Sequence, residues 1–267
     1  MAIRTSGSGG SIKLTGTGGG MRITSSGGGG SPPMTMLGAW YRADDLNQAD
    51  GSSVSTWADR SGNGADLVAI SGISQPTLIA SSPAFNGQKA IDLNGSQQLQ
   101  RLLPPGYQGS DSAFSAYIVA QPANAGSLYA FCWGQPFGTG DNVALAWFTY
   151  LGNRAFTTTD SAVMGSPVFS ATSNPQIVSV FNGQAQDIAT SETLIDGAIP
   201  ATLGPGEPGV LSIPVPVAEV RLGSHFGNGS TVFTGQIAEI IYYKKKHDSS
   251  ERAATLSYLS SRYGISI

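Results

Sequence analysis

Short apolar runs separated by turn residues make up most of the chain from Met34 onward. They recur at intervals of about eight to fifteen residues, which is typical of all-β sandwiches and barrels. The predicted strands cover residues 37–41, 90–93, 114–120, 128–133, 144–150, 155–158, 175–181, 186–190, 219–222 and 235–243. The pattern therefore predicts an all-β, two-sheet β-sandwich.

The run over 235–243 shows how the predicted sheet is covered. Strict alternation places Ile237, Glu239 and Ile241 on one face of this strand. Ile240 and Tyr242 then lie on the opposite face. Because both faces carry apolar residues, we expect the sheet to be covered on both sides.

The last twenty residues have the period of a helix instead. Asp248 and Glu251 have the spacing of a capping box, in which each side chain accepts a hydrogen bond from a backbone N–H at the helix start. Apolar residues then share one helix face at i, i+3 and i+7: Leu256, Leu259 and Tyr263. Gly264 follows where a helix could end. We expect one C-terminal helix that packs its apolar face on the sandwich.

The first 31 residues repeat a nine-residue unit three times, each unit a short apolar and basic run followed by Gly and Ser. A segment this rich in Gly cannot bury enough apolar surface to offset its ordering entropy. We expect it to be an arm that docks on another chain by adding short strands to that chain's sheet, although a flexible linker or a tag remnant has a similar composition. The docking residues are Ile3, Arg4, Ile12, Lys13, Leu14, Met21, Arg22 and Ile23. The arm covers 1–31 and the sandwich domain covers 32–267.

Composition narrows the choice of partners. Charged residues are only 12% of the chain and the net charge is −3, so we expect no nucleic-acid partner. Cys132 is the chain's one cysteine, so no intrachain disulfide forms, and it lies in an apolar run. We expect no membrane span, because no stretch is long and apolar enough, and no signal peptide, because the start lacks an apolar core.

Several segments together resemble a known family. They are Leu37-Gly-Ala-Trp-Tyr-Arg-Ala-Asp-Asp45, Trp57-Ala-Asp-Arg-Ser-Gly-Asn-Gly64, Asn86-Gly-Gln-Lys-Ala-Ile-Asp-Leu-Asn-Gly95 and Phe233–Tyr243 with the helix after it. This order resembles the concanavalin A-like (laminin-G-like) jelly-roll domains of bacterial surface proteins and phage virion proteins, over residues 34–267. The resemblance implies a jelly-roll sandwich. The usual acidic position of the first segment is Arg42 here.

The resemblance also raises the possibility of catalysis, because jelly rolls of this type include glycoside hydrolases. Retaining hydrolysis needs two carboxylates about 5 Å apart, which these enzymes carry as alternating acids on one strand. No such run occurs, and the five glutamates are far apart in sequence. Neither His225 nor His247 has a recognisable catalytic partner. We therefore expect that the chain is not an enzyme.

Oxygen ligands near the family segments raise the question of calcium, which related domains often bind. The available residues are Asp44, Asp45, Asp59, Asn63 and Asp92. Turn and cap hydrogen bonds would use the same oxygens. The chain has no loop with calcium-hand spacing, which favours the hydrogen-bonding role. No other cofactor is expected.

Glycan binding is the usual role of such domains, and it needs exposed aromatic rings beside polar groups. The possible platforms are Trp133, Trp147, Tyr107 and Phe137, with core packing as the alternative for each tryptophan. Lys244–Lys246 could contact an acidic glycan or a neighbouring subunit.

These observations together favour a phage virion structural protein, assembled in the host cytoplasm and anchored to other virion proteins by its arm. Its sandwich would face outward as a capsid decoration or tail component and bind host-surface glycans. An arm that exchanges strands also predicts a homo-oligomer. The alternatives are a free or cell-surface carbohydrate-binding lectin and, less favoured, a glycan-cleaving enzyme.

Overall fold

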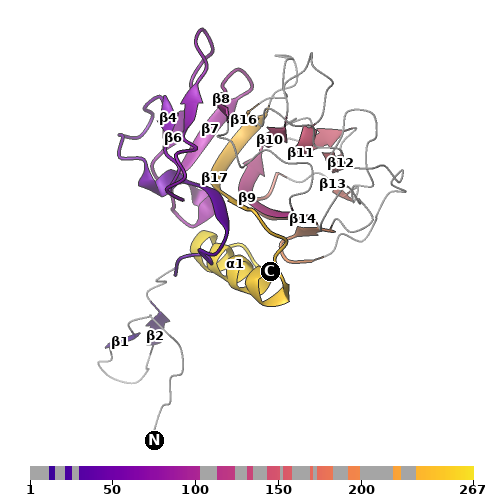
Figure 1. Cartoon of the computed structure of the whole chain (residues 1–267). Coiled ribbons are helices and arrows are strands. Elements are labelled where there is room, and N and C mark those ends of the chain that lie inside the picture. The colour runs from indigo at the N-terminus through magenta and orange to yellow at the C-terminus, as the bar shows by residue number, and fades with distance from the viewer. Residues whose placement is uncertain are drawn as a thin grey trace, which may run out of the picture.

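A computed structural model shows an all-β sandwich with one C-terminal helix (Figure 1). The structure describes residues 12–15, 22–25, 30–102, 113–123, 131–134, 143–150, 153–157, 169–170, 173–182, 192–198, 219–223 and 233–267. Within these residues the predicted two-sheet β-sandwich is confirmed.

One sheet has seven strands in the described residues, all paired antiparallel. Its order is β15 (Glu192–Ile195), β14 (Gln176–Asn182), β9 (Phe114–Pro122), β17 (Thr234–Tyr243), β7 (Ala90–Asn94) and β6 (Thr77–Ile79). β3 (Leu37–Arg42) also pairs with β17, beyond the end of its pairing with β7. β17 is therefore a central strand with neighbours along both edges.

The second sheet has eight strands in the described residues. Its order is β13 (Phe169–Ser170), β12 (Asn153–Thr157), β11 (Val143–Tyr150), β10 (Phe131–Gly134), β16 (Glu219–Leu222), β8 (Leu99–Leu102), β5 (Leu67–Ala69) and β4 (Thr56–Trp57). Two short 3₁₀ helices, η1 (Ala43–Asp45) and η2 (Pro83–Phe85), complete the domain together with α1 (Ser249–Tyr263).

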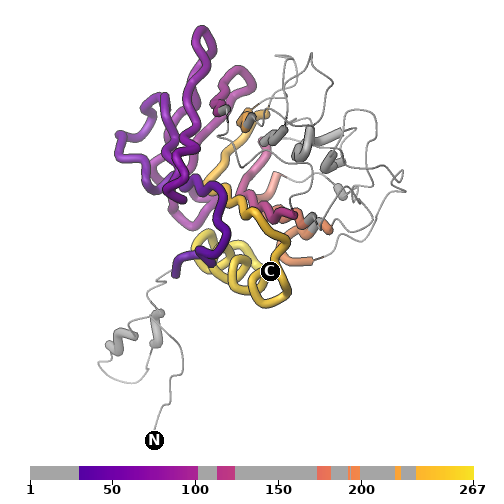
Figure 2. The backbone as a smooth tube through the Cα atoms, in the orientation of Figure 1, coloured from indigo at the N-terminus to yellow at the C-terminus, as the bar shows by residue number. Residues whose placement is uncertain are grey.

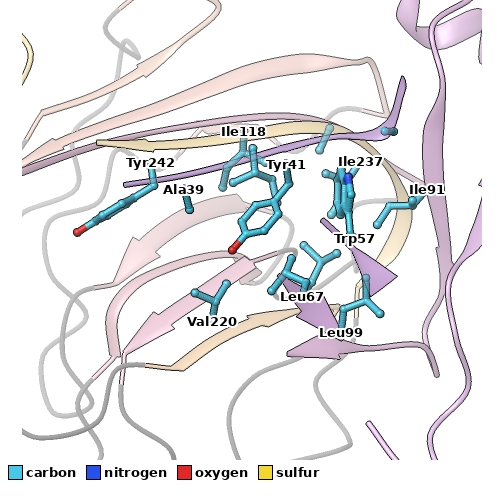
Figure 3. Packing of buried hydrophobic residues seen from close by; sticks show 14 of the residues in the cluster. Ala39, Tyr41, Trp57, Leu67, Ile91, Leu99, Ile118, Val220, Ile237 and Tyr242 are labelled. Atoms are coloured by element: carbon cyan, nitrogen blue, oxygen red, sulfur yellow. The ribbon is translucent and has the colours of Figure 1, made fainter. Parts of the chain in front are cut away.

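The core between the two sheets is apolar and aromatic (Figure 3). Tyr41 and Ile118 come from the seven-stranded sheet and Leu67, Leu99 and Val220 from the eight-stranded one, and all are buried. Trp57 is also buried here, at 1% exposed. Each large side chain buried in this way contributes roughly 1.5–3 kcal/mol.

α1 covers the other face of the seven-stranded sheet, which gives three layers (Figure 2). The three residues that the sequence placed on its apolar face, Leu256, Leu259 and Tyr263, are buried, as are Thr255 and Tyr258. Both halves of the Asp248–Glu251 capping box are present. Gly264 ends the helix at φ 68°, a left-handed conformation that glycine adopts without strain. The helix prediction is confirmed in position and in buried face.

A β-bulge corrects the predicted alternation of β17. Ile237 pairs with Ala120 and Glu239 with Val119, so Ala238 is an extra residue. Ile237 therefore lies with Ile240 in the core between the sheets. Strict alternation predicted that Ile237 and Ile241 lie on the same face of the strand. In the structure only Ile241 lies on the helix-facing side.

The sequence predicted the described strands of five or more residues, but it missed several of the shorter ones. The missed strands include β4, β5, β6 and β8, which have two to four residues each. β8 reads Leu-Gln-Arg-Leu and carries too few apolar residues to stand out. The strand expected at 186–190 lies outside the described residues.

In the N-terminal segment, β1 (Ile12–Thr15) pairs antiparallel with β2 (Arg22–Ser25). Lys13 stands opposite Thr24, and Leu14 opposite Ile23. Ile3, Arg4 and Met21 lie outside the described residues. Pro32, at the start of the domain, is buried. Among the residues that were searched, no helix has the length and apolar character needed to cross a membrane.

Candidate functional site

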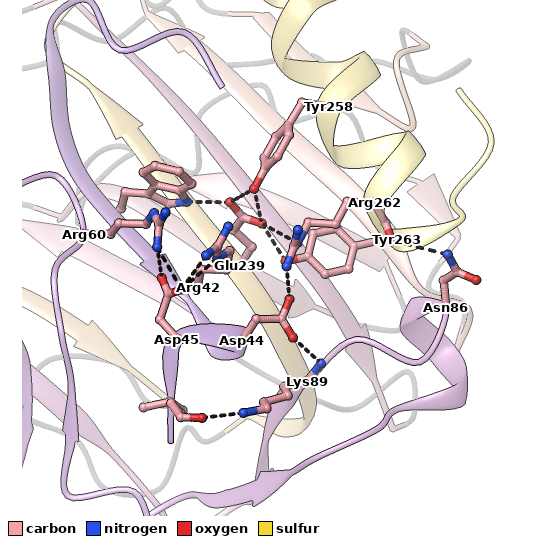
Figure 4. A network of polar contacts seen from close by, with 12 residues as sticks. Arg42, Asp44, Asp45, Arg60, Asn86, Lys89, Glu239, Tyr258, Arg262 and Tyr263 are labelled. Carbon is pink, nitrogen blue, oxygen red and sulfur yellow. Dashed lines mark hydrogen bonds and ion pairs between the residues drawn. The ribbon is translucent and has the colours of Figure 1, made fainter. Parts of the chain in front are cut away.

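Glu239 is a fully buried acid in the middle of β17, with 0% of its surface exposed. The bulge at Ala238 places it on the helix-facing side of the sheet. Its Oε1 accepts hydrogen bonds from Trp40 Nε1 at 2.5 Å and Tyr258 Oη at 2.9 Å. Its Oε2 accepts one from Tyr263 Oη at 2.5 Å (Figure 4). The carboxylate thus joins two strands of the sheet to the C-terminal half of α1.

Two effects act on the pKa of the Glu239 carboxylate in opposite directions. Burial raises the pKa of Glu239, and the hydrogen bonds from Tyr263, Trp40 and Tyr258 act in the other direction. The balance leaves the pKa above its usual value. Burial also raises the pKa of both tyrosines, so they remain donors.

Arg262 links this buried acid to the surface. Its Nε lies 4.0 Å from Glu239 Oε2, and its Nη2 forms an ion pair with Asp44 Oδ2. Asp44, in η1, also accepts a hydrogen bond from the backbone N–H of Lys89 at 2.8 Å. Lys89 Nζ in turn donates to the carbonyl of Leu46 at 2.5 Å. α1 is therefore tied to η1 as well as to the sheet.

A second carboxylate, Asp45, holds two arginines at the edge of the cluster. Arg60 Nη1 lies 2.8 Å from Oδ1 and 2.9 Å from Oδ2, and Arg42 bonds the same carboxylate. Burial would raise the pKa of Asp45, but the hydrogen bonds from Arg42 and Arg60 outweigh it and lower the pKa. The Arg60 guanidinium also lies 4.7 Å from the centre of the Trp40 ring, a cation–π distance. Arg42, at the usually acidic position of the first segment, is thus an ion-pair partner.

The cluster is built to hold the fold in place. Glu239 is 0% exposed and Tyr263 1%, so neither side chain can touch a substrate in this conformation. Every carboxylate oxygen of Glu239 accepts from a protein donor. The sequence missed this role. An acid inside the apolar run Ile-Ala-Glu-Ile-Ile was the available signal, because a buried charge needs partners.

The residues considered for calcium have separate roles. Asp59 accepts backbone hydrogen bonds from Trp40, Ser61 and Ala65, as a turn-capping residue does. Asn63 uses its amide as a donor to the carbonyls of Leu37 and Gly38.

The other three residues considered for calcium also have separate roles. Asp44 and Asp45 pair with arginines. Asp92, in β7, is half-buried, and burial raises its pKa. Among the residues searched, no group of three or more His, Cys, Asp or Glu side chains is placed to hold a metal.

A second polar cluster lies under the other end of α1, around His247. The ring is 2% exposed, and its Nδ1 is 2.9 Å from Tyr117 Oη. The His247 backbone N–H donates to Ser115 Oγ at 2.8 Å. Burial lowers the pKa of His247 to about 4.

The aromatic residues expected to meet glycan are only partly placed. Trp133 lies in β10 opposite Val220, and Trp147 lies in β11 opposite Phe131. Their side chains, and all of Tyr107 and Phe137, lie outside the described part of the chain. Their role stays a prediction.

Lys245 and Lys246, which follow β17, form ion pairs. Lys245 pairs with Glu251 at 2.5 Å, and Lys246 with Glu192 at 2.9 Å. Glu251 belongs to α1, so Lys245 contacts the helix directly. Glu192 belongs to β15 and also pairs with Arg252 of α1, so Lys246 contacts the helix only through this shared acid.

Comparison with solved structures identifies the fold. Trypanosoma rangeli sialidase in complex with sialic acid matches over 86% of this chain and 34% of its own, with a TM-score of 0.54 and 12% identity. The binding domain of botulinum neurotoxin DC in complex with rat synaptotagmin II matches over 86% of this chain and 52% of its own, with a TM-score of 0.56 and 10% identity. The chain thus spans about a third of the sialidase and half of the toxin domain. No protein-family model matches it, and no curated protein matches it in sequence.

These similarities correct the expectation that the chain is not an enzyme. Sialidases are enzymes, and they contain the fold of this chain. The search for alternating acids tested a single catalytic arrangement, whereas sialidases use a tyrosine nucleophile in place of one carboxylate. The absence of that run was therefore no evidence against catalysis. At these identities the comparison shows the fold, and it neither confirms nor replaces the resemblance to concanavalin A-like domains.

Proposed function

We propose that this chain is a glycan-binding β-sandwich domain. The observation that carries the proposal is a shared fold over 86% of the chain with a sialidase solved with sialic acid and with the binding domain of a neurotoxin. Charged residues make up only 12% of the sequence, which agrees with a hydroxyl-rich ligand that needs few ionic contacts.

The outer face of the eight-stranded sheet is the most favourable place for the glycan. α1 covers the outer face of the other sheet. On the eight-stranded sheet, register aligns Val68 with Gln100 and Gln100 with Arg221 across three neighbouring strands. These residues alternate with the core residues Leu67, Leu99 and Val220. They therefore form a row on the outer face.

This row combines the groups that sugars need. Val68 is 37% exposed and offers an apolar contact. Arg221 and Gln100 are half-buried, and Arg221 Nη2 donates to Gln100 Oε1 at 3.3 Å, which orients both side chains. An amide and a guanidinium supply donors and an acceptor for hydroxyl groups.

A glycan array with the full chain, followed by calorimetry on the glycans that bind, tests the proposal. We expect binding, and we expect Arg221→Ala to weaken it about tenfold by removing a directed donor. Ser257→Ala, an exposed change on α1 at the far side of the domain from this row, is the control and should leave binding unchanged. Failure to bind any glycan would contradict the function, whereas binding that Arg221→Ala leaves unchanged would move the site elsewhere. Release of free sugar in the same samples would reveal catalysis.

We also propose that residues 1–31 anchor this domain to a larger particle, a phage virion. Two features support an anchor: a Gly-rich repeat with recurring basic residues, and the pairing of β1 with β2 ahead of the domain. A two-stranded sheet is marginally stable alone, so it gains from pairing with another chain. The virion role rests on the resemblance to virion domains. Immunogold labelling of intact particles tests it, and unlabelled particles would argue against it.

A further inference from the structure

His247 lies at the junction of β17 and α1 and contacts both the sheet and the helix. Its ring meets Tyr117 of β9 at 2.9 Å. Its backbone carbonyl accepts a hydrogen bond from Arg252 Nε, in the first turns of α1, at 3.0 Å. A change at this one residue therefore alters contacts with both the sheet and the start of the helix.

The position suits a neutral imidazole only. The ring packs against Tyr243 with 4.0 Å between ring centroids. Its Nε2 is buried and has no hydrogen-bond partner among the described residues. A protonated ring would place a donor and a positive charge there with no acceptor, which is costly in a buried site.

The charged groups around the ring come from the junction and from α1. Lys245 and Arg252 disfavour a charged imidazole, while Glu251 and Asp248 favour it. The sheet contributes the hydroxyl groups of Tyr117, Tyr243 and Ser115. Burial outweighs the two acids, as the pKa of about 4 for His247 indicates.

The acids at this end of α1 are held in their charged form by basic partners. Glu192 binds Arg252 and Lys246, and the hydrogen bond from Arg252 lowers its pKa to about 2. The hydrogen bond from Lys245 lowers the pKa of Glu251. The lowered pKa values of Glu192 and Glu251 favour the charged acids on acidification, whereas the imidazole gains its charge at a buried position.

We propose that α1 is an acid-released cover and that His247 is its trigger. Proton uptake from solvent by the imidazole expels the ring from its site, and the N-terminal half of α1 separates from the sheet with it. The C-terminal half stays attached through Glu239, Tyr258 and Tyr263. The opening uncovers an aromatic face formed by Tyr117, Phe181 and Tyr243, which pack on one another under the helix.

Hydrogen exchange of the full chain between pH 7 and pH 4.5, corrected for intrinsic rates, tests this. An exposed histidine titrates near 6.5, so opening coupled to His247 should become roughly tenfold or more easier over this range. We expect residues 249–256 to lose protection by that factor relative to β9. His247→Phe keeps an aromatic ring without the titrating nitrogen, and it should abolish the difference. His225→Gln, at the chain's other histidine, is the control and should keep it.

Two results would overturn the proposal. One is loss of protection in α1 and β9 together, which would mean global acid unfolding. The other is an unchanged pH dependence in His247→Phe. If that variant folds poorly, an NMR titration of the wild-type ring decides: a midpoint at or above 6.5 would refute a buried neutral His247, and one well below it supports the trigger.

Discussion

The two ends of α1 rest on the same sheet through opposite chemistry. The C-terminal end is held by an acid, Glu239, whose partners are three neutral donors and one arginine. The N-terminal end is held by a base, His247, among tyrosine and serine hydroxyls. Burial penalises the charged form in both places, so it raises the pKa of the acid and lowers that of the base.

The comparison shows that one helix can respond to pH in two directions. A buried histidine with a lowered pKa loses its stabilising effect as pH falls toward that pKa. A buried acid with a raised pKa loses its stabilising effect as pH rises through that pKa. Falling pH therefore loosens the N-terminal end, and rising pH loosens the C-terminal end.

Removing the acid should have the largest effect. Glu239→Ala leaves the indole of Trp40 and two tyrosine hydroxyls buried without an acceptor, which should cost about 3 kcal/mol or more of unfolding free energy. Glu239→Gln keeps an acceptor oxygen and should cost about 1–2 kcal/mol. Urea denaturation of the full chain measures both. Equal losses in the two variants would contradict the hydrogen-bonding role of the cluster.

The pH dependence of this end should be smaller and has a definite sign. In the wild type, the Glu239 contribution is complete below the unfolded pKa near 4.5 and declines as pH rises through the raised folded value. Each pKa unit of separation corresponds to about 1.4 kcal/mol. Because Glu239→Gln does not titrate, we expect its stability relative to wild type to improve from pH 4.5 upward. Chemical denaturation at a series of pH values checks this, and a constant difference would show that burial does not raise the pKa.

Sequence patterns predicted the helix well and its two anchoring sites poorly. The capping box and the apolar face of α1 are local features, with periods that the sequence displays directly. The partners of Glu239 lie 199 residues away at Trp40 and 19 and 24 residues away at Tyr258 and Tyr263. No local period encodes such contacts. The single-residue bulge at Ala238 shows no local signal either, and it shifted the predicted face of Ile237.

The individual site residues show the same difference between local and distant contacts. Asp59 caps its own turn, as its Gly- and Asn-rich surroundings suggested. The sequence shows no recognisable catalytic partner for His247, and the Tyr117 hydroxyl that its ring contacts lies 130 residues away in sequence. Residues that act within a turn are thus readable from sequence, whereas residues that join layers need the folded arrangement.

The smallest effect should come from the helix cap, which the sequence did predict. Asp248 accepts hydrogen bonds from the backbone N–H groups of Ser250 and Glu251, each at 2.9 Å. Asp248→Ala leaves these groups to water, which replaces the bonds at an exposed helix start. We expect a stability loss well below that of Glu239→Ala, measured by urea denaturation. Asp248→Ser, which keeps a capping oxygen, is the matched control and should recover most of it.

If Asp248→Ala lowered the unfolding free energy as much as Glu239→Ala does, the proposed difference between the two ends of α1 would be wrong. It would mean that the N-terminal end of α1 carries as much of the domain's stability as the buried acid does. The capping residue Asp248 is adjacent to His247 in sequence. Loss of the cap should therefore also raise the pH at which the N-terminal half of α1 separates from the sheet. Hydrogen exchange of residues 249–256 in Asp248→Ala should then show weaker protection already at pH 7, with β9 unchanged. If β9 loses protection as well, the N-terminal end cannot open by itself, and the helix leaves the sheet only when the whole domain unfolds.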